Sequence, residues 1–329
     1  MTFSRAEAAV GTSGTSTPAR SASTQSHSWR GFLYIAAATF CWGAAATAGK
    51  AVFSGRLFSG HTFISPLVLT QARTTFAVAV LLVFLVIRYG LGFFRISRRD
   101  LLLSLLVGTL GLAGSNFFYY FAIEKSTVAI AITLQYTAPI WVLLTMVLAG
   151  RERATAGRFA AVLLAVLGCA LTIDLFQSGL SGSRIGIIAA LLASFSYAFY
   201  NIAAQSLVSR NHQFKIMAYA LLGAAVLWAV LNPPWRLAAQ NYSAGQWAFL
   251  FLFACLSMLL PYFFYFTGLK YLDPTRAVLA SCLEPVFAIL FAAVFVQEGL
   301  RWSQILGIAA VLGSVVMVQL HGRTITLKE

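Results

Sequence analysis

Residues 101–122 read LLLSLLVGTLGLAGSNFFYYFA, a run of 22 positions without Asp, Glu, Lys or Arg. A helix rises about 1.5 Å per residue, so roughly 20 apolar residues cross the hydrocarbon core of a bilayer. This stretch therefore predicts a transmembrane helix. Of the 329 residues in the chain, 60% are hydrophobic and only 10% are charged. Charged residues make up about a quarter of an ordinary soluble domain, so the composition predicts an all-α polytopic membrane protein.

Apolar runs of similar length recur along the chain and predict ten transmembrane helices. The ten runs are Phe32–Phe53, Leu67–Ile87, Leu101–Phe121, Val128–Ala149, Phe159–Ile173, Ile185–Val208, Ile216–Leu231, Trp247–Phe266, Ala277–Val296 and Ile305–Leu320. Residues 1–29 are rich in Ser and Thr and have no apolar core of signal-peptide length, which predicts a disordered cytoplasmic tail. Residues 322–329 form a second, short cytoplasmic tail.

The placement of the basic residues predicts the orientation of the chain. A net charge of +14 would indicate nucleic-acid binding on a folded surface, but here the basic residues lie in short loops between apolar runs. Sixteen of the 23 Lys and Arg residues lie in the two tails and in alternate loops, and the opposite loops hold five. Because short cytoplasmic loops retain positive charge, we expect a multi-pass protein of the cell membrane with both termini in the cytoplasm.

The two halves of the sequence can be aligned with each other. Gly31, Trp42 and Lys50 fall on Gly186, Tyr197 and Gln205 at an offset of 155, and Tyr119, Pro139 and Glu152 fall on Tyr265, Pro285 and Glu298 at an offset of 146. Two five-span units follow, over residues 30–176 and 184–321. An odd number of spans places the units in opposite senses, which predicts two inverted five-helix repeats with a substrate site between them.

Polar side chains inside spans are costly in lipid and usually face the interior of the bundle. Tyr197, Asn201 and Gln205 recur every four residues and so share one face of the sixth span. This stripe either lines a cavity or joins helices by hydrogen bonds. Lys50 and Arg73 lie nearer the ends of their spans, where a long side chain can reach the headgroups instead of a site.

The fourth and ninth spans each carry an internal proline, Pro139 and Pro285, which frees a backbone carbonyl and bends the helix. Glu284 is an acid well inside a span, and it either exchanges protons as a coupling group or has a structural role, capping freed backbone or pairing with Arg276. The residues expected to bind substrate are Trp42, Lys50, Arg73, Asn116, Tyr119, Gln135, Tyr197, Asn201, Gln205, Tyr262, Tyr265 and Ser281.

Two segments carry the marks of a known family. Residues 118–153 (FYYFAIEKSTVAIAITLQYTAPIWVLLTMVLAGRER) and 264–313 (FYFTGLKYLDPTRAVLASCLEPVFAILFAAVFVQEGLRWSQILGIAAVLG) each combine an aromatic helix end, a span with a central proline and an acidic residue beyond it. They resemble the two EamA domains of the drug/metabolite transporter superfamily. The resemblance implies ten spans as two inverted repeats and cargoes such as amino acids, other metabolites, nucleotide-linked sugars or drugs, usually exported in bacterial members.

The function predicted is therefore secondary or facilitative transport that exports a small metabolite, such as an amino acid, by alternating access through a central cavity between the inverted repeats. No P-loop is present, so direct ATP drive is not expected, and neither a cofactor nor a metal is expected. All four histidines lie in tails, loops or span ends, so no nucleophile and base meet within a span and no catalytic residue is predicted. A non-transporting receptor or assembly factor with a ligand cavity is the alternative.

Overall fold

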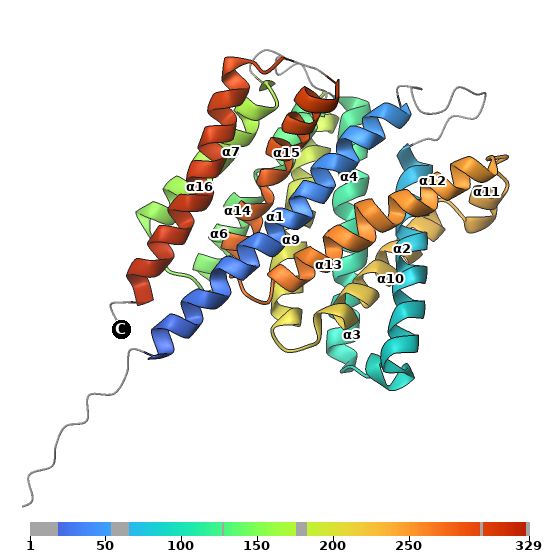
Figure 1. Cartoon of the computed structure of the whole chain (residues 1–329), viewed down its shortest axis with the longest axis horizontal. Coiled ribbons are helices and arrows are strands. Elements are labelled where there is room, and N and C mark those ends of the chain that lie inside the picture. Colours follow the sequence, from blue (N-terminus) through green and yellow to red (C-terminus); the bar gives the residue numbers. More distant parts are fainter. Residues whose placement is uncertain (1–18, 54–65, 127, 176–182, 297–298, 327–329) are drawn as a thin grey trace, which may run out of the picture.

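The computed structural model describes residues 19–53, 66–126, 128–175, 183–296 and 299–326, which form helices and the turns that join them (Figure 1). The elements are α1 (Ala19–Phe53), α2 (Pro66–Tyr89), η1 (Leu91–Phe94), α3 (Arg98–Leu106), η2 (Val107–Ala113), α4 (Gly114–Lys125), α5 (Val128–Gln135), α6 (Ala138–Leu148), α7 (Ala156–Thr172), α9 (Arg184–Val208), α10 (Gln213–Leu231), α11 (Pro234–Ala238), α12 (Ala244–Ala254), η3 (Cys255–Leu259), α13 (Leu260–Gly268), α14 (Pro274–Ser281), α15 (Leu283–Phe291), η4 (Ala292–Val296) and α16 (Trp302–Thr326).

Within the described residues, eight helical stretches are long and apolar enough to cross a membrane. They are Leu67–Tyr89, Arg98–Lys125, Ile130–Leu148, Arg184–Val208, Gln213–Leu231, Ala244–Gly268, Pro274–Phe295 and Trp302–Leu320. The fifth predicted span corresponds to a shorter apolar helix, Ala156–Thr172, and the first lies in α1. The protein is thus an all-helical, multi-pass membrane protein, and the count of ten spans stays a prediction.

Large apolar side chains on the outside of the bundle fit a lipid environment. Ile87 is 80% exposed, Leu148 86% and Trp302 80%. A soluble protein rarely leaves so many large apolar groups in water, whereas hydrocarbon tails solvate them well.

The two helical stretches with internal prolines are interrupted close to those prolines. The first breaks at the turn between α5 and α6, and Pro139 then occupies the first turn of α6. The second breaks at Cys282, and Pro285 follows in the first turn of α15. A proline lacks the N–H that would bond the carbonyl four residues earlier, which explains why both helices end and restart here.

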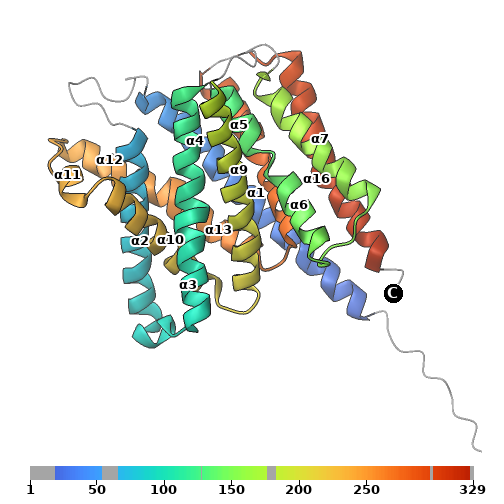
Figure 2. The ribbon, with the colours of Figure 1, turned by 180° about the vertical axis from the view of Figure 1, so that it is seen from behind.

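Packing joins helices that are far apart in sequence. The α3–η2–α4 stretch and α9 run side by side in Figure 2, and α4 packs against α9. Likewise α1 packs against α13, and α7 against α16 at one edge of the bundle (Figure 1). The middle of the molecule is therefore built from both halves of the sequence.

The terminal helices extend further than the predicted domain limits. The first helix, α1, begins at Ala19, inside the stretch 1–29 that was expected to be a disordered tail, and α16 runs to Thr326, past residue 321. Adding a residue to an existing helix requires no new nucleus, so a helix can continue beyond the apolar residues that fix its place in the membrane.

Candidate functional site

Aromatic side chains from three helices meet at the centre of the bundle. The ring of Trp42 in α1 lies 5.2 Å from that of Tyr262 and 5.3 Å from that of Tyr265, both in α13. Tyr200 in α9 lies 5.6 Å from Tyr265, and these two side chains are fully buried. Trp42 belongs to the first half of the sequence, and the three tyrosines belong to the second.

The polar stripe of α9 contacts this aromatic cluster through its middle member. The side chain of Asn201 is fully buried, accepts a hydrogen bond from the Tyr265 hydroxyl, and donates one of 2.8 Å to the Tyr197 carbonyl. The ring of Tyr197 stacks on that of Tyr200 at 5.8 Å. The structure brings no described side chain into hydrogen bonding with Gln205, one turn further along. In this conformation the polar stripe joins α9 to α13. A substrate that bound here would have to replace these hydrogen bonds with its own.

Arg73 in α2 points into the bundle and not toward the headgroups. Its Nη2 donates a hydrogen bond of 3.1 Å to Asn116 Oδ1 of α4, and its Nε is buried without a hydrogen-bond partner. The Asn116 amide is held in turn by the Leu112 carbonyl at 2.7 Å. The side chain of Lys50, the other ambiguous cation, lies outside the described residues.

Glu284 bonds across the two halves of the sequence. Its Oε2 accepts a hydrogen bond of 2.9 Å from the Tyr136 hydroxyl. The expected alternative, a pair with Arg276, is wrong: Arg276 Nε lies 3.2 Å from Asp273, whose side chain also caps α14 by accepting from the Arg276 backbone N–H. The Asp273 carboxylate at the start of α14 therefore binds the Arg276 guanidinium, and Glu284 does not.

The remaining predicted residues lie around the helix breaks. Gln135 Nε2 donates a hydrogen bond of 2.9 Å to Ser115 Oγ, which donates to the Ala193 carbonyl at 3.2 Å. Ser281 is fully buried and precedes the break of the ninth span. The ring of Tyr119 lies 5.3 Å from that of Tyr120, and Tyr119 is close enough to Glu284 for electrostatic interaction.

The structure adds residues that were not among the predicted site residues. Tyr136 contacts Glu284, Tyr200 contacts the central rings, and Ser115 contacts Gln135. Tyr136 neighbours Gln135, and Tyr200 lies one helical turn from Tyr197, so position on the same helices was the available signal.

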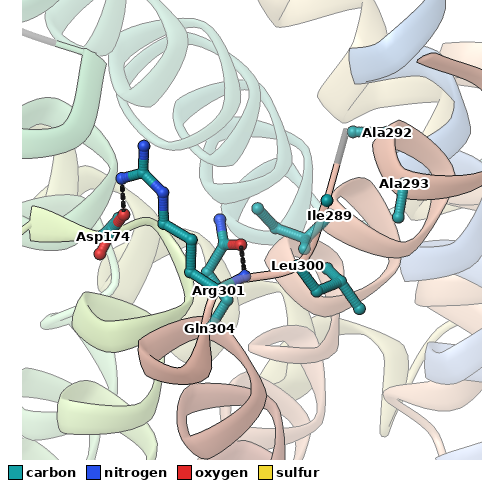
Figure 3. Close-up of a pocket in the computed structure, with 8 residues that line it drawn as sticks. Asp174, Ile289, Ala292, Ala293, Leu300, Arg301 and Gln304 are labelled. Carbon is teal, nitrogen blue, oxygen red and sulfur yellow. Dashed lines mark hydrogen bonds and ion pairs between the residues drawn. The ribbon is translucent and has the colours of Figure 1, made fainter. Parts of the chain in front are cut away.

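A cavity of about 320 Å³ lies elsewhere, between the end of α7, α15 with η4, and the start of α16 (Figure 3). Its polar wall is the ion pair of Asp174 with Arg301, beside Gln304, and Asp174 also accepts a 2.9 Å hydrogen bond from Ser303. Its apolar wall includes Ile289. Among the residues whose side chains the structure describes, no predicted site residue lines this cavity.

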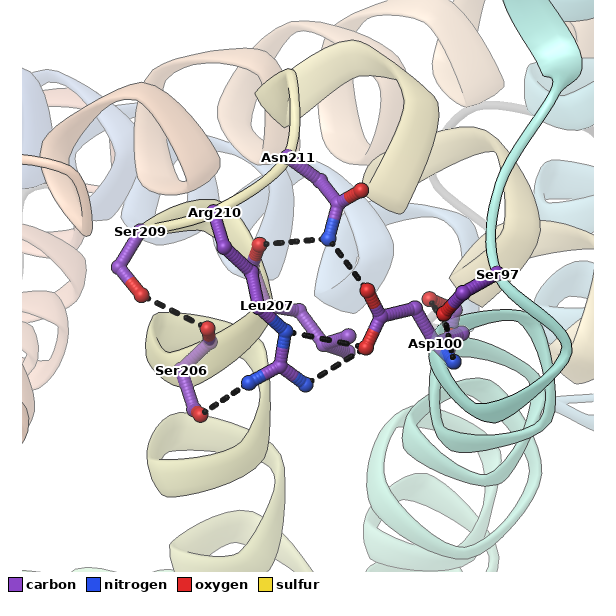
Figure 4. A network of polar contacts seen from close by, with 8 residues as sticks. Ser97, Asp100, Ser206, Leu207, Ser209, Arg210 and Asn211 are labelled. Carbon is purple, nitrogen blue, oxygen red and sulfur yellow. Dashed lines mark hydrogen bonds and ion pairs between the residues drawn. The ribbon is translucent and has the colours of Figure 1, made fainter.

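At the other end of the bundle, hydrogen bonds from a charged side chain join α3 to the end of α9. Asp100 accepts hydrogen bonds of 2.7 and 3.0 Å from the Arg210 guanidinium and of 3.0 Å from Asn211 (Figure 4). Glu152 pairs with Arg158 of α7 at 2.6 Å. Burial, and then the charge of Asp273, raise the pKa of Glu152. Its repeat counterpart, Glu298, lies outside the described residues.

Comparison with known proteins decides the family. The model of the EamA-like transporter family matches residues 29–174 and again residues 184–320. The chain belongs to the EamA-like transporter family. Two separate matches cover nearly all of this EamA-like transporter after its first residues.

Relatives of this EamA-like transporter are themselves named as transporters, not as enzymes. The uncharacterized inner membrane transporter YicL of Salmonella typhimurium is 22% identical over 89% of this chain and 96% of that protein. An uncharacterized transporter of Archaeoglobus fulgidus is 28% identical over 63% of this chain and 74% of its own length. The threonine/homoserine exporter RhtA of Salmonella typhimurium is 29% identical over 69% of this chain and 72% of the exporter.

A solved crystal structure of a protein shares the fold of this EamA-like transporter. It superposes with a TM-score of 0.72 at 20% sequence identity and covers 91% of this chain and 98% of that one. A likeness at this identity concerns the fold alone.

Proposed function

We propose that this membrane transporter works by secondary or facilitative transport and exports a small metabolite, such as an amino acid, by alternating access. The proposed site is the central cluster, which consists of Trp42, Arg73, Tyr136, Tyr200, Tyr262, Tyr265 and Glu284. The observation that carries the proposal is the meeting of polar and aromatic groups from both halves of the sequence, with Glu284 bonded to Tyr136 and Trp42 against Tyr265. Interior polar groups in membrane proteins commonly mark transport pathways. The name of the relative RhtA, a threonine/homoserine exporter, supports an amino acid and outward transport.

We further propose that the chain forms ten spans in two inverted repeats. The helix contacts follow the pattern expected of two equivalent halves. The contact of α4 with α9 joins the third span of the first half to the first span of the second half, and the contact of α13 with α1 joins the third span of the second half to the first span of the first half. The contact of α7 with α16 joins the fifth span of one half to the fifth span of the other, so it stays the same when the halves are exchanged. Repeats related by a twofold axis in the membrane plane would produce this pattern.

The proposed location is the cell membrane with both termini in the cytoplasm, as the distribution of Lys and Arg predicts. The ends that carry Asp100, Arg210 and Glu152 would then face the cytoplasm, and the Asp174–Arg301 pair would face outward.

Glu284 is the proposed coupling group. A carboxylate inside a span, bonded to a hydroxyl and not to a cation, can take up and release a proton as the surroundings change. Proton coupling is tested in proteoliposomes that contain a pH-sensitive dye, in which substrate flux should move protons in the wild type and not in Glu284→Gln.

The substrate is found first by comparing metabolites inside and outside cells with and without the protein. Each compound depleted from cells is then tested for flux across proteoliposomes of the purified protein. We expect saturable flux above that of protein-free liposomes. Binding of a compound with flux equal to the protein-free control would reject transport and favour a receptor.

A further inference from the structure

Two charged side chains inside the bundle, one from each half of the sequence, are each hydrogen bonded to a neutral group. Arg73 in α2 hydrogen bonds to the neutral amide of Asn116, and Glu284 in α15 to the neutral hydroxyl of Tyr136. Within the part of the chain that the structure describes, neither forms an ion pair. A charge inside the membrane is costly and is usually paired or functional. Arg73 and Glu284 are therefore the residues of the central cluster for which a functional role is most expected.

Arg73 retains unused hydrogen-bond donors. A guanidinium has five N–H groups in a planar fork, and Arg73 Nε is buried without a partner. Asn116, itself held by the Leu112 carbonyl at 2.7 Å, fixes the Nη2 group of that fork at 3.1 Å. Carboxylates and phosphates both accept two parallel N–H bonds from a guanidinium. The free donor of this oriented guanidinium therefore suits an anionic group of a ligand, and a carboxylate is the smaller of the two.

Glu284 supplies the opposite charge from the other half of the sequence. Arg73 lies near enough for its charge to act on Glu284, and both charges act on Tyr262. The Tyr262 ring packs 5.2 Å from that of Trp42. A carboxylate beside aromatic rings suits an ammonium group, which gains from the negative charge and from the ring faces.

We propose that Arg73 binds the carboxylate and Glu284 the ammonium group of a zwitterionic substrate, an amino acid. This inference rests on the proposed transport at the central cluster. An anion alone would leave Glu284 unpaired beside it, and a cation alone would leave Arg73 unpaired. A zwitterion gives each charge a partner and adds no net charge to the interior of the bundle.

The test uses the purified wild-type protein and ligands of graded charge. The common L-amino acids are screened by thermal stabilisation, and the strongest binder is compared with its carboxamide and with its N-acetyl derivative. Losing one partner of a buried charge pair costs at least about a thirtyfold loss of affinity, so we expect each derivative to bind at least that much more weakly. No stabilising amino acid, or equal binding of the carboxamide, would overturn the inference.

Variants assign the two ends of the ligand. Arg73→Gln should remove the preference for the free acid over the carboxamide, and Glu284→Gln should remove the preference for the free amine over the N-acetyl form. Arg73→Lys, which keeps the charge, should keep part of the preference. Arg88→Gln, at the exposed end of α2, is the matched control and should change neither. A preference for the free acid that survives in a folded Arg73→Gln protein would contradict the assignment.

Flux measurements separate this inference from the proposed function. Transport of a compound that lacks one of the two charges, with no effect of Arg73→Gln, would leave transport standing and refute the charge pair. Binding of the amino acid with charge preferences as expected, but without flux in proteoliposomes, would leave the pair standing and refute transport.

Discussion

The Tyr136 hydroxyl donates a hydrogen bond of 2.9 Å to Glu284 Oε2, and 148 positions of sequence separate the two residues. Tyr136 lies in the turn between α5 and α6, and Glu284 lies in the first turn of α15. The bond thus connects the interruptions of two proline-containing helices, one from each half of the chain. Any movement that separates these helices has to break it.

Replacing Tyr136 by Phe tests the contribution of this bond. The ring stays, but the carboxylate loses its donor, so we expect the free energy of unfolding to fall by about 1–3 kcal/mol, as for other buried groups left unpaired. Thermal melting in detergent measures the loss. Tyr89→Phe, at the exposed end of α2, is the control. Equal melting of both variants would show that the bond adds nothing to stability.

Asn201→Leu tests whether the α9 stripe lines the substrate site. Asn201 bonds to Tyr265, so the change should lower stability by about 0.6–2 kcal/mol, the range for bonds between membrane helices. If Asn201 also contacts substrate, flux per folded molecule should fall sharply. Flux and melting temperature are measured on one preparation. Normal flux with a lowered melting temperature would assign Asn201 to helix packing alone.

Acidification should destabilise the loop between α9 and α10 through His212. Burial, then the charges of Lys270 and Lys215, lower the pKa of His212 from its ordinary value of 6.5. Between the lowered native pKa and 6.5 the unfolded chain binds more protons than the native one, so stability rises with pH through this window and is lost as pH falls. In His212→Asn the slope of melting temperature against pH just below 6.5 should be flatter, whereas His27→Asn should keep it.

Two glycines of α16 allow a matched test of helix packing. A Cβ on Gly307 would overlap the Thr172 backbone nitrogen of α7, whereas a Cβ on Gly313 would have its nearest neighbour at 3.6 Å, in Leu164. We expect Gly307→Ala to destabilise by about 1–3 kcal/mol by overpacking, and Gly313→Ala to cause no loss. Melting curves of the two variants decide. Equal stability would mean that α7 and α16 are not so closely packed.

Labelling of single cysteines tests the orientation. In a background without the four native cysteines, Ala154→Cys should react with an impermeant reagent from the cytoplasmic side and Gln240→Cys from the other side, as the distribution of basic residues predicts. Both positions are exposed loop residues. Labelling of both from the same side would contradict the proposed topology.

The helices could be predicted from the sequence because a transmembrane span depends on length and apolar composition alone. The breaks near Pro139 and Pro285 were predictable for a similarly local reason, the missing N–H of proline. The hydrogen-bond partners of the site residues could not be predicted from the sequence. Asn201 was placed on a polar face, but its bond with Tyr265 depends on how α9 and α13 pack.

Arg73 illustrates the same limit for a charged residue. Its position in the span allowed either an outward or an inward side chain, and only the place of Asn116 on α4 shows which one the fold holds. For Glu284, spacing along the predicted span allowed a pair with Arg276, but spacing says nothing of Asp273, which binds Arg276 at the start of α14.

The closeness of α7 and α16 restricts how the protein can move. At Gly168, an added Cβ would lie 2.8 Å from both the backbone nitrogen and a side-chain carbon of Val311, so the backbones of α7 and α16 approach closely at this point. Small residues that let two backbones approach this closely favour tight helix packing, so we expect α7 and α16 to move together. One comes from residues 30–176 and the other from residues 184–321. If transport follows the proposed alternating access, the rearrangement then lies within each proposed five-span unit, and not between the two units moving as whole bodies.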